Sequence, residues 1–269
     1  MNIASFFDYQ FVQNAYLSGA FIAIPCAMLG LALVLRKLSL IGDGLSHVSF
    51  GAIALGLFMG LWPLYVAVPV VVIAAYFIWQ LSAKTKLYGD AAIGIVSAVG
   101  IASGVILASL SKGFNIDLFS YLFGNILAIT SQEVYLSVGL SALVFIAIIW
   151  FYQDLFAATF DEDYAKASGI KTSRINFILM TLTAITVVLA IKVVGVMLVS
   201  ALLIIPASAA LQISRGFKMA MITSAIVALL SLLLGISLSL YLDWPAGATI
   251  ILTSFVIFII LFLVGRIKK

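Results

Sequence analysis

Long runs of uncharged apolar residues are the feature that most constrains this chain. Residues 219–241 and 246–265, for example, contain no charged side chain. A helix needs about 20 such residues to cross the hydrocarbon core of a bilayer. Hydrophobic residues make up 65% of the chain and charged residues only 9%, whereas soluble domains are about half apolar and about a quarter charged. The chain is therefore a polytopic integral membrane protein.

Nine stretches of the chain predict transmembrane helices, because each is an apolar run bounded by glycine, proline or charge. The runs are continuously apolar and do not alternate with a period of two, which argues against a β-barrel. We expect an all-α bundle of eight or nine crossings, with residues 1–269 forming one transmembrane domain. The second crossing is polar at its start and could be partly re-entrant. The predicted crossings are 12–35, 38–61, 64–83, 91–111, 133–152, 175–193, 195–213, 219–241 and 246–265.

The basic residues predict which end of the bundle faces the cytoplasm. With the N-terminus outside, 12 of the 14 Lys and Arg residues fall on one side, and only Lys112 and Lys192 fall on the other. Positive residues gather on the cytoplasmic side of membrane proteins, so we predict an external N-terminus and a cytoplasmic C-terminus. Residues 114–130, which mix polar and large apolar side chains, would then form an external interfacial helix.

Several function classes are excluded by what the sequence lacks. The single cysteine, Cys26, cannot form an internal disulfide or a multi-cysteine metal site. The basic residues are scattered between crossings, so no nucleic-acid partner is expected. No Walker motif is present, so the chain has no ATP site of its own. No G-x-S-x-G elbow is present either. We therefore expect that the chain is not itself an enzyme.

The stretch "GDGLSHVSFG" at 42–51 holds the only histidine of the chain, His47, four residues after Asp43. Residues at this spacing share one face of a helix. Counted from the basic pair Arg36–Lys37 at ~1.5 Å per residue, His47 lies on the order of 15 Å into the bilayer. Ionisable residues at that depth are costly and mark functional sites.

Three interpretations of this pair remain open from the residues alone. The pair could stabilise helix packing, it could relay protons, since histidine titrates near neutrality, or it could coordinate a metal. An oxygen and a nitrogen ligand on one face suit a divalent transition metal, and this interpretation is favoured. Two ligands are too few for a tetrahedral site, so two-fold symmetry would complete it, with Asp43 and His47 supplied by each of two subunits.

Proline and small residues inside the predicted crossings suggest where a path could run. Pro25 and Pro206 each free a backbone carbonyl, as in a packed kink or a bent, pore-lining helix. Glycine pairs four residues apart, such as Gly100 and Gly104, allow close helix contact. The candidate path-lining residues are Pro25, Ser46, Ser200, Pro206 and Ser208.

The segment 159–174, "TFDEDYAKASGIKTSR", is the most charged part of the chain and lies on the predicted cytoplasmic side. Its acidic residues suit a helix N-terminus, and Gly169 suits the position after a helix C-cap. We expect one short amphipathic helix along the membrane, as a capped connector or as a docking helix for a cytoplasmic partner. The candidate contact residues are Phe160, Asp161, Glu162, Asp163, Tyr164, Ala165, Lys166, Ala167 and Gly169.

With these segments in view, the chain resembles the membrane subunits of bacterial zinc, manganese and iron ABC importers, the ABC-3 permeases, and the zinc type most closely. The resemblance covers nearly the whole chain. It is carried by "LRKLSLIGDGLSHVSFGAIALG" (35–56), "DLFSYLFGNILAIT" (117–130), "FDEDYAKASGI" (160–170), "AIKVVGVMLVSALLIIPASAA" (190–210) and "YLDWPAG" (241–247).

The resemblance implies a type II importer-like permease in the bacterial cytoplasmic membrane. It implies a homodimer, two cytoplasmic ABC ATPase subunits that bind ATP, and an extracytoplasmic metal-binding protein. Asp43 and His47 would line the metal path, and the segment at about 159–173 would be the coupling helix. No cofactor is expected to be held permanently; the transported ion would be Zn²⁺, with Mn²⁺ or Fe²⁺ as alternatives.

We therefore expect the permease of an ATP-driven divalent-metal importer, with zinc as the leading ion. A proton-coupled secondary metal transporter is the alternative, and it would need no ATPase at 161–170. A non-transporting membrane scaffold would leave the intramembrane pair of Asp43 and His47 unexplained.

Overall fold

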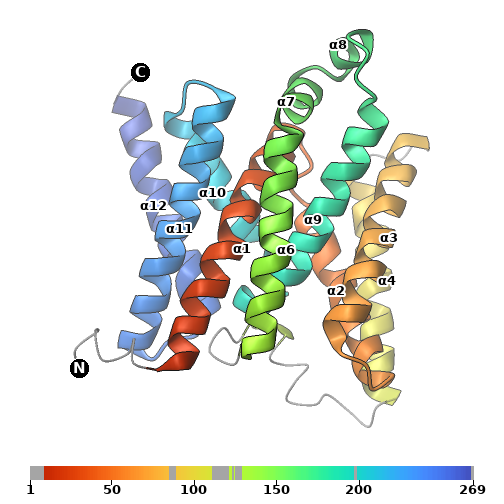
Figure 1. Ribbon diagram of the computed structural model, residues 1–269, viewed down its shortest axis with the longest axis vertical. Coiled ribbons are helices and arrows are strands. Elements are labelled where there is room, and N and C mark those ends of the chain that lie inside the picture. Colours follow the sequence, from red (N-terminus) through yellow and green to blue (C-terminus); the bar gives the residue numbers. More distant parts are fainter. Residues whose placement is uncertain are drawn as a thin grey trace.

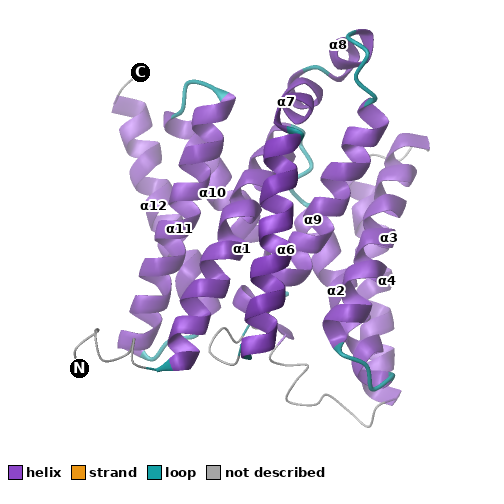
Figure 2. Ribbon diagram, in the orientation of Figure 1, coloured by secondary structure: helices purple, strands orange, loops and turns teal. Residues whose placement is uncertain are grey.

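The computed structural model describes residues 9–84, 89–110, 121–122, 124, 129–196 and 199–267. Figure 2 shows these residues as helices joined by loops, and they contain no strand, so the all-α prediction is confirmed. The helices are α1 (Gln10–Leu35), α2 (Ile41–Phe58), α3 (Pro63–Lys84), α4 (Gly89–Leu110), α6 (Ser131–Trp150), α7 (Tyr152–Phe160), α8 (Glu162–Ala167), α9 (Thr172–Val194), α10 (Val199–Ile213), α11 (Phe217–Leu242) and α12 (Ala246–Ile267).

Eight of the helices in the described ranges are long and apolar enough to cross a membrane, and α10 is a shorter apolar helix. Successive long helices run in opposite directions, with α10 as a ninth passage (Figure 1). The start of α1 and the end of α12 consequently lie at opposite ends of the bundle, as an odd number of passages requires. Helices α7 and α8 connect α6 to α9 at the upper end of the bundle in Figure 1.

The passage predicted at 195–213 is shorter than expected. Helix α9 ends at Val194, and Gly195 takes a φ of +85°, a left-handed value that glycine adopts readily. The backbone N–H of Val196 then donates to the carbonyl of Tyr121 over 3.0 Å, so this residue serves a tertiary turn instead of a helix. Hydropathy alone does not detect such a turn, because the residues that form it are apolar.

Two other predictions concern the segment before α6 and the second crossing. The interfacial helix predicted at 114–130 lies mostly outside the described residues. Helix α6 begins where Thr130 and Glu133 form a capping box, each side chain bonding to the other residue's backbone N–H. The second predicted crossing is a continuous 18-residue helix, α2, and is not re-entrant.

Helices α2 and α4 approach each other closely because glycines line their crossing. A Cβ atom on Gly100 would lie 2.7 Å from the Cα atom of Val48, and one on Gly51 would lie 2.5 Å from the carbonyl oxygen of Gly100. No side chain fits in these spaces without moving backbone. The small-residue pattern therefore does predict close helix contact here, and α2 sits at the centre of one half of the bundle, packed against α3, α4, α9 and α10.

Candidate functional site

Helix α2 is buried along most of its length and is partly exposed at two side chains. From Ile41 to Ala54, every residue is buried except Asp43 and His47. The side chain of Asp43 is 46% exposed and that of His47 is 23% exposed. The two partly exposed positions of this stretch are thus its two ionisable residues.

The two side chains lie next to each other on one face of α2. The Nδ1 atom of His47 is 3.9 Å from the Oδ2 atom of Asp43, which is longer than a hydrogen bond. The same Nδ1 atom is 2.7 Å from the hydroxyl oxygen of Ser97 on α4. Because one ring nitrogen is engaged by Ser97, the imidazole is held in one orientation and Nε2 remains the ring atom available to an ion.

Ser97 is a part of the site that the sequence did not indicate. It reaches His47 because the glycine-lined crossing brings α4 close to α2, and Ser97 precedes Gly100 by one helical turn. The Gly100–Gly104 spacing was the available signal, since it marks the face of α4 that meets a neighbour. It did not show which helix that neighbour is.

The donor set of one chain is incomplete as a metal site. Within the described ranges, no group of three or more His, Cys, Asp or Glu side chains is close enough to hold an ion. Asp43 and His47 would offer one oxygen and one nitrogen ligand, and no third such residue joins them within the described residues. A tetrahedral ion needs four ligands.

The remaining path candidates differ in how free their polar groups are. The hydroxyl of Ser46 donates to the carbonyl of Asp43 over 2.8 Å and so is occupied by its own helix. The hydroxyl oxygen of Ser200 is buried, has no hydrogen-bond partner in the described part of the chain, and lies beside Gly42. Pro25 and Pro206 are buried inside the continuous helices α1 and α10, and Ser208 is partly buried on α10.

The charged segment forms the short helix that was predicted, with the caps at the predicted positions. Asp161 is the N-cap of α8, and its Oδ1 atom accepts from the N–H of Tyr164 over 2.9 Å. Gly169 follows the C-cap with a φ of +87°. Ala165 is fully buried, whereas Tyr164 is 68% exposed. Helix α7, which leads into α8, was not expected as a separate element.

The exposed face of α8 carries charges of both signs. Lys166 lies 3.2 Å from Glu162 and 3.5 Å from Asp163. The hydrogen bond and negative charge of Glu162 raise the pKa of Lys166 above its usual value. Phe160 and Tyr164 expose large rings beside these charges. A surface of this kind suits a protein partner better than lipid.

Arg36 connects the start of this segment to the bundle. Its Nε atom donates to the hydroxyl of Thr159 on α7 over 3.1 Å, and its Nη1 atom donates to the side-chain carbonyl of Asn176 on α9. Its Nη2 atom is buried and has no partner in the described ranges. Burial lowers the pKa of Arg36, and the negative charge of Glu162 opposes that shift. The residue at the end of α1 thereby holds both α7 and α9.

At the opposite end of the bundle, a buried ion pair joins α6 to α9. The Nζ atom of Lys192 lies 2.8 Å from Oε1 of Glu133, and these side chains are 21% and 7% exposed. The same ammonium group sits 4.4 Å from the ring centre of Tyr121. Lys192, which was predicted on the external side, therefore contacts Tyr121, the residue whose carbonyl bonds to the turn between α9 and α10.

Comparison with known proteins adds relatives along the whole chain. Residues 8–265 match the ABC 3 transport family. A manganese transport system membrane protein of Halalkalibacterium halodurans is 31% identical over 97% of this chain and 91% of its own length. A high-affinity zinc uptake system membrane protein of Haemophilus influenzae is 32% identical over 94% of this chain and 97% of its own.

A solved structure shares the fold. PsaBC from Streptococcus pneumoniae, solved in complex with a Fab, contains a chain that superposes with a TM-score of 0.88 at 32% identity, covering 97% of this chain and 95% of that one. The relatives include proteins named for manganese and for zinc at nearly equal identity.

Proposed function

We infer, because this chain belongs to the ABC 3 transport family, that it is the membrane-spanning permease subunit of an ATP-driven importer for a divalent transition metal. The observation that carries this proposal is the pattern of burial along α2: from Ile41 to Ala54, only Asp43 and His47 are partly exposed, and all other residues are buried. An uncovered carboxylate and imidazole inside a membrane are expensive unless they face water, an ion or a partner.

A second copy of the chain would complete the ligand set. Two chains related by a two-fold axis would place two Asp43 carboxylates and two His47 rings around one ion. The exposure of both side chains in the single chain supports such a shared site. Each ring would be held by Ser97 of its own chain, with Nε2 directed at the ion.

Zinc is the ion that we propose first. Two nitrogen and two oxygen ligands suit the tetrahedral preference of Zn²⁺, whereas Mn²⁺ prefers more oxygen ligands in an octahedral arrangement. Relatives named for zinc and for manganese match this chain equally well, so the ligand chemistry is what favours zinc. Mn²⁺ and Fe²⁺ are the competing ions for the experiment below.

Helix α8 would contact the cytoplasmic ATPase subunits, of which the transporter would have two. It would receive the conformational change that ATP hydrolysis drives in them. Its charged face and the rings of Phe160 and Tyr164 are exposed, as a docking helix requires. Motion of α8 would pass through α7 to Arg36, which also holds α9 and stands seven residues before Asp43. An extracytoplasmic metal-binding protein would deliver the ion at the other end, and the site must hold it weakly enough to let it leave.

The experiment is metal-stimulated ATP hydrolysis by the complete transporter in liposomes, with the metal-loaded binding protein added on the outside. We expect Zn²⁺ to stimulate hydrolysis more than Mn²⁺ or Fe²⁺. Stimulation by Mn²⁺ alone would support the assignment as a permease and contradict zinc as the transported ion. Uptake of metal by liposomes that contain only this chain, without any ATPase, would reject an ABC permease in favour of a secondary transporter.

A further inference from the structure

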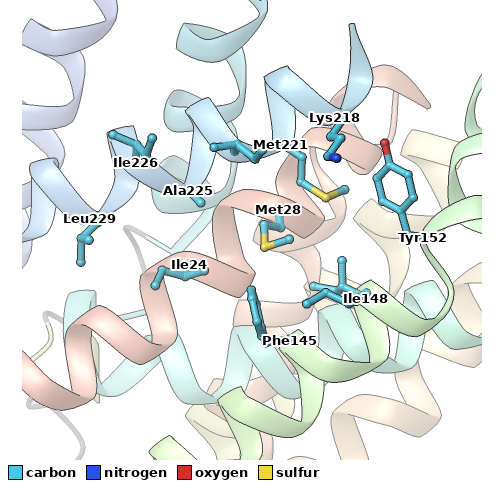
Figure 3. Close-up of a pocket in the computed structure, with 12 residues that line it drawn as sticks. Ile24, Met28, Phe145, Ile148, Tyr152, Lys218, Met221, Ala225, Ile226 and Leu229 are labelled. Carbon is cyan, nitrogen blue, oxygen red and sulfur yellow. The ribbon is translucent and has the colours of Figure 1, made fainter.

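A long groove runs along the outside of the bundle between α1, α6 and α11. Its volume is about 560 Å³, and Ile24, Met28, Phe145, Met221, Ile226 and Leu229 are among the side chains that line it. Figure 3 shows these apolar side chains arranged along the groove, with Lys218 and Tyr152 together at one end. Ile226 is 52% exposed and Ile222, beside it, is 48% exposed, so the groove is open toward the lipid.

The polar groups of the groove are confined to one end, which the distribution of basic residues predicts to be cytoplasmic. Lys218 lies in the first turn of α11, which starts at the end of the bundle where α7 and α8 lie (Figure 1). Lys218 is exposed and has no ion-pair partner in the described part of the chain. The hydroxyl of Tyr152 stands beside it in Figure 3. One cation and one hydroxyl thus lie at the end of an otherwise apolar groove.

Aromatic side chains mark the same end as the level of the membrane–water interface. The ring of Phe217 lies 5.7 Å from Tyr152 and 5.4 Å from Phe156, between centres. A second hollow at this end shares Tyr152, Lys218 and Ile222 with the groove. Tyrosine is enriched at headgroup depth in membrane proteins, so Tyr152 favours a position for Lys218 at the level of the lipid phosphate groups.

The length of the groove matches one leaflet. From Lys218 to Leu229, α11 advances 11 residues, or ~16 Å at 1.5 Å per residue. Half of a hydrocarbon core of ~30 Å is ~15 Å. A transmembrane helix of a partner protein would require an apolar surface across both leaflets, whereas an acyl chain with a headgroup at one end requires the layout observed here.

We propose that this groove binds an anionic phospholipid of the cytoplasmic leaflet, with an acyl chain between α1, α6 and α11 and its phosphate at Lys218 and Tyr152. Anionic lipids are abundant in that leaflet, and basic pockets between transmembrane helices on that side bind their headgroups. The groove is separate from the Asp43–His47 pair, because α2, which carries that pair, packs mainly against α3, α4, α9 and α10. The proposal does not depend on the transported ion.

Native mass spectrometry of the full chain in neutral detergent tests the proposal. Phosphatidylglycerol and phosphatidylcholine with identical acyl chains compete for the protein. We expect phosphatidylglycerol to be retained about fivefold better, the ratio that corresponds to about 1 kcal/mol for one lysine. Lys218→Gln should bring the ratio to about one. Arg266→Gln, which removes a cation at the same end of the bundle but outside the groove, should leave the fivefold preference intact.

Equal retention of the two lipids by the wild-type chain would overturn the proposal, and so would an unchanged preference in Lys218→Gln. Ala225→Trp, which places a large side chain in the middle of the groove, should reduce retention of both lipids. An Ile226→Cys variant tests for a protein occupant in native membranes, because the natural Cys26 is buried and gives no background. Disulfide-linked pairs of that variant would show that a second copy, and not lipid, covers the groove.

Discussion

The Nδ1 atom of His47 lies 2.7 Å from the hydroxyl oxygen of Ser97, 50 residues away along the chain. This contact joins the proposed metal ligand to a helix that carries no ionisable group at that level. A partner on one ring nitrogen fixes the plane of an imidazole and the nitrogen that it presents, and such outer partners commonly change metal affinity by 10–100-fold. The first prediction follows from it.

Ser97→Ala should raise the KM for metal uptake by roughly 10-fold while lowering the maximal rate much less, because the ring loses its orientation but not its place. Ser97→Thr keeps a hydroxyl on the same carbon and should restore the KM. Uptake into liposomes by the complete transporter, measured over a range of metal concentrations, separates the two parameters. An unchanged KM in Ser97→Ala would mean that the serine serves only helix packing.

Gly100→Ala should destabilise the protein, since its new Cβ atom would lie 2.7 Å from the Cα atom of Val48. Overpacking of this kind costs about 1–3 kcal/mol, so the Tm of the purified chain should fall by several degrees. Gly94→Ala on the same helix is the matched control, because no heavy atom lies within 4 Å of its added carbon. Equal Tm values for the two variants would contradict the close crossing of α2 and α4.

Asp161→Ala should weaken the coupling of ATP hydrolysis to transport. The substitution removes the N-cap of α8, which is worth about 1 kcal/mol of helix stability, and it frees the N–H of Tyr164. Asp161→Asn retains a capping oxygen and should behave nearly as the wild type. The ratio of metal ions transported to ATP hydrolysed is the measurement; a wild-type ratio in Asp161→Ala would show that α8 is only a connector.

Glu133→Gln should lower stability by about 3–5 kcal/mol, because it leaves the partly buried ammonium of Lys192 without its carboxylate. Lys192→Met alone should be damaging for the reciprocal reason. The double variant should be more stable than the sum of the two losses, since no buried charge is then left alone. Denaturation of all four proteins gives the coupling energy, and strictly additive losses would show that the pair does not interact.

The sequence predicted the long helices and the capped helix α8 because both depend on local patterns. Apolar runs mark the long helices, and Asp161 and Gly169 mark the two ends of α8 through their own backbone preferences. The pairing of Asp43 with His47 is equally local, as it needs only one helical turn.

The contacts that organise the site were not predictable in the same way. Ser97 meets His47, and Arg36 meets Thr159 and Asn176, only because particular helices are neighbours. A single sequence shows which face of a helix is small or polar but not which helix packs against it. The short α10 was missed for a related reason, because the turn at Gly195 is held by the carbonyl of Tyr121, some 70 residues earlier in the chain.

The central claim is that the ion passes between Asp43 and His47, and uptake by a His47→Ala transporter tests it most directly. Ser49→Ala is the control, because Ser49 lies on the same helix and its hydroxyl donates to the carbonyl of Leu45. With radioactive zinc, binding protein and ATP supplied, the account predicts that His47→Ala inserts normally and takes up no zinc above background, while Ser49→Ala transports at the wild-type rate. Wild-type uptake by His47→Ala would contradict the claim.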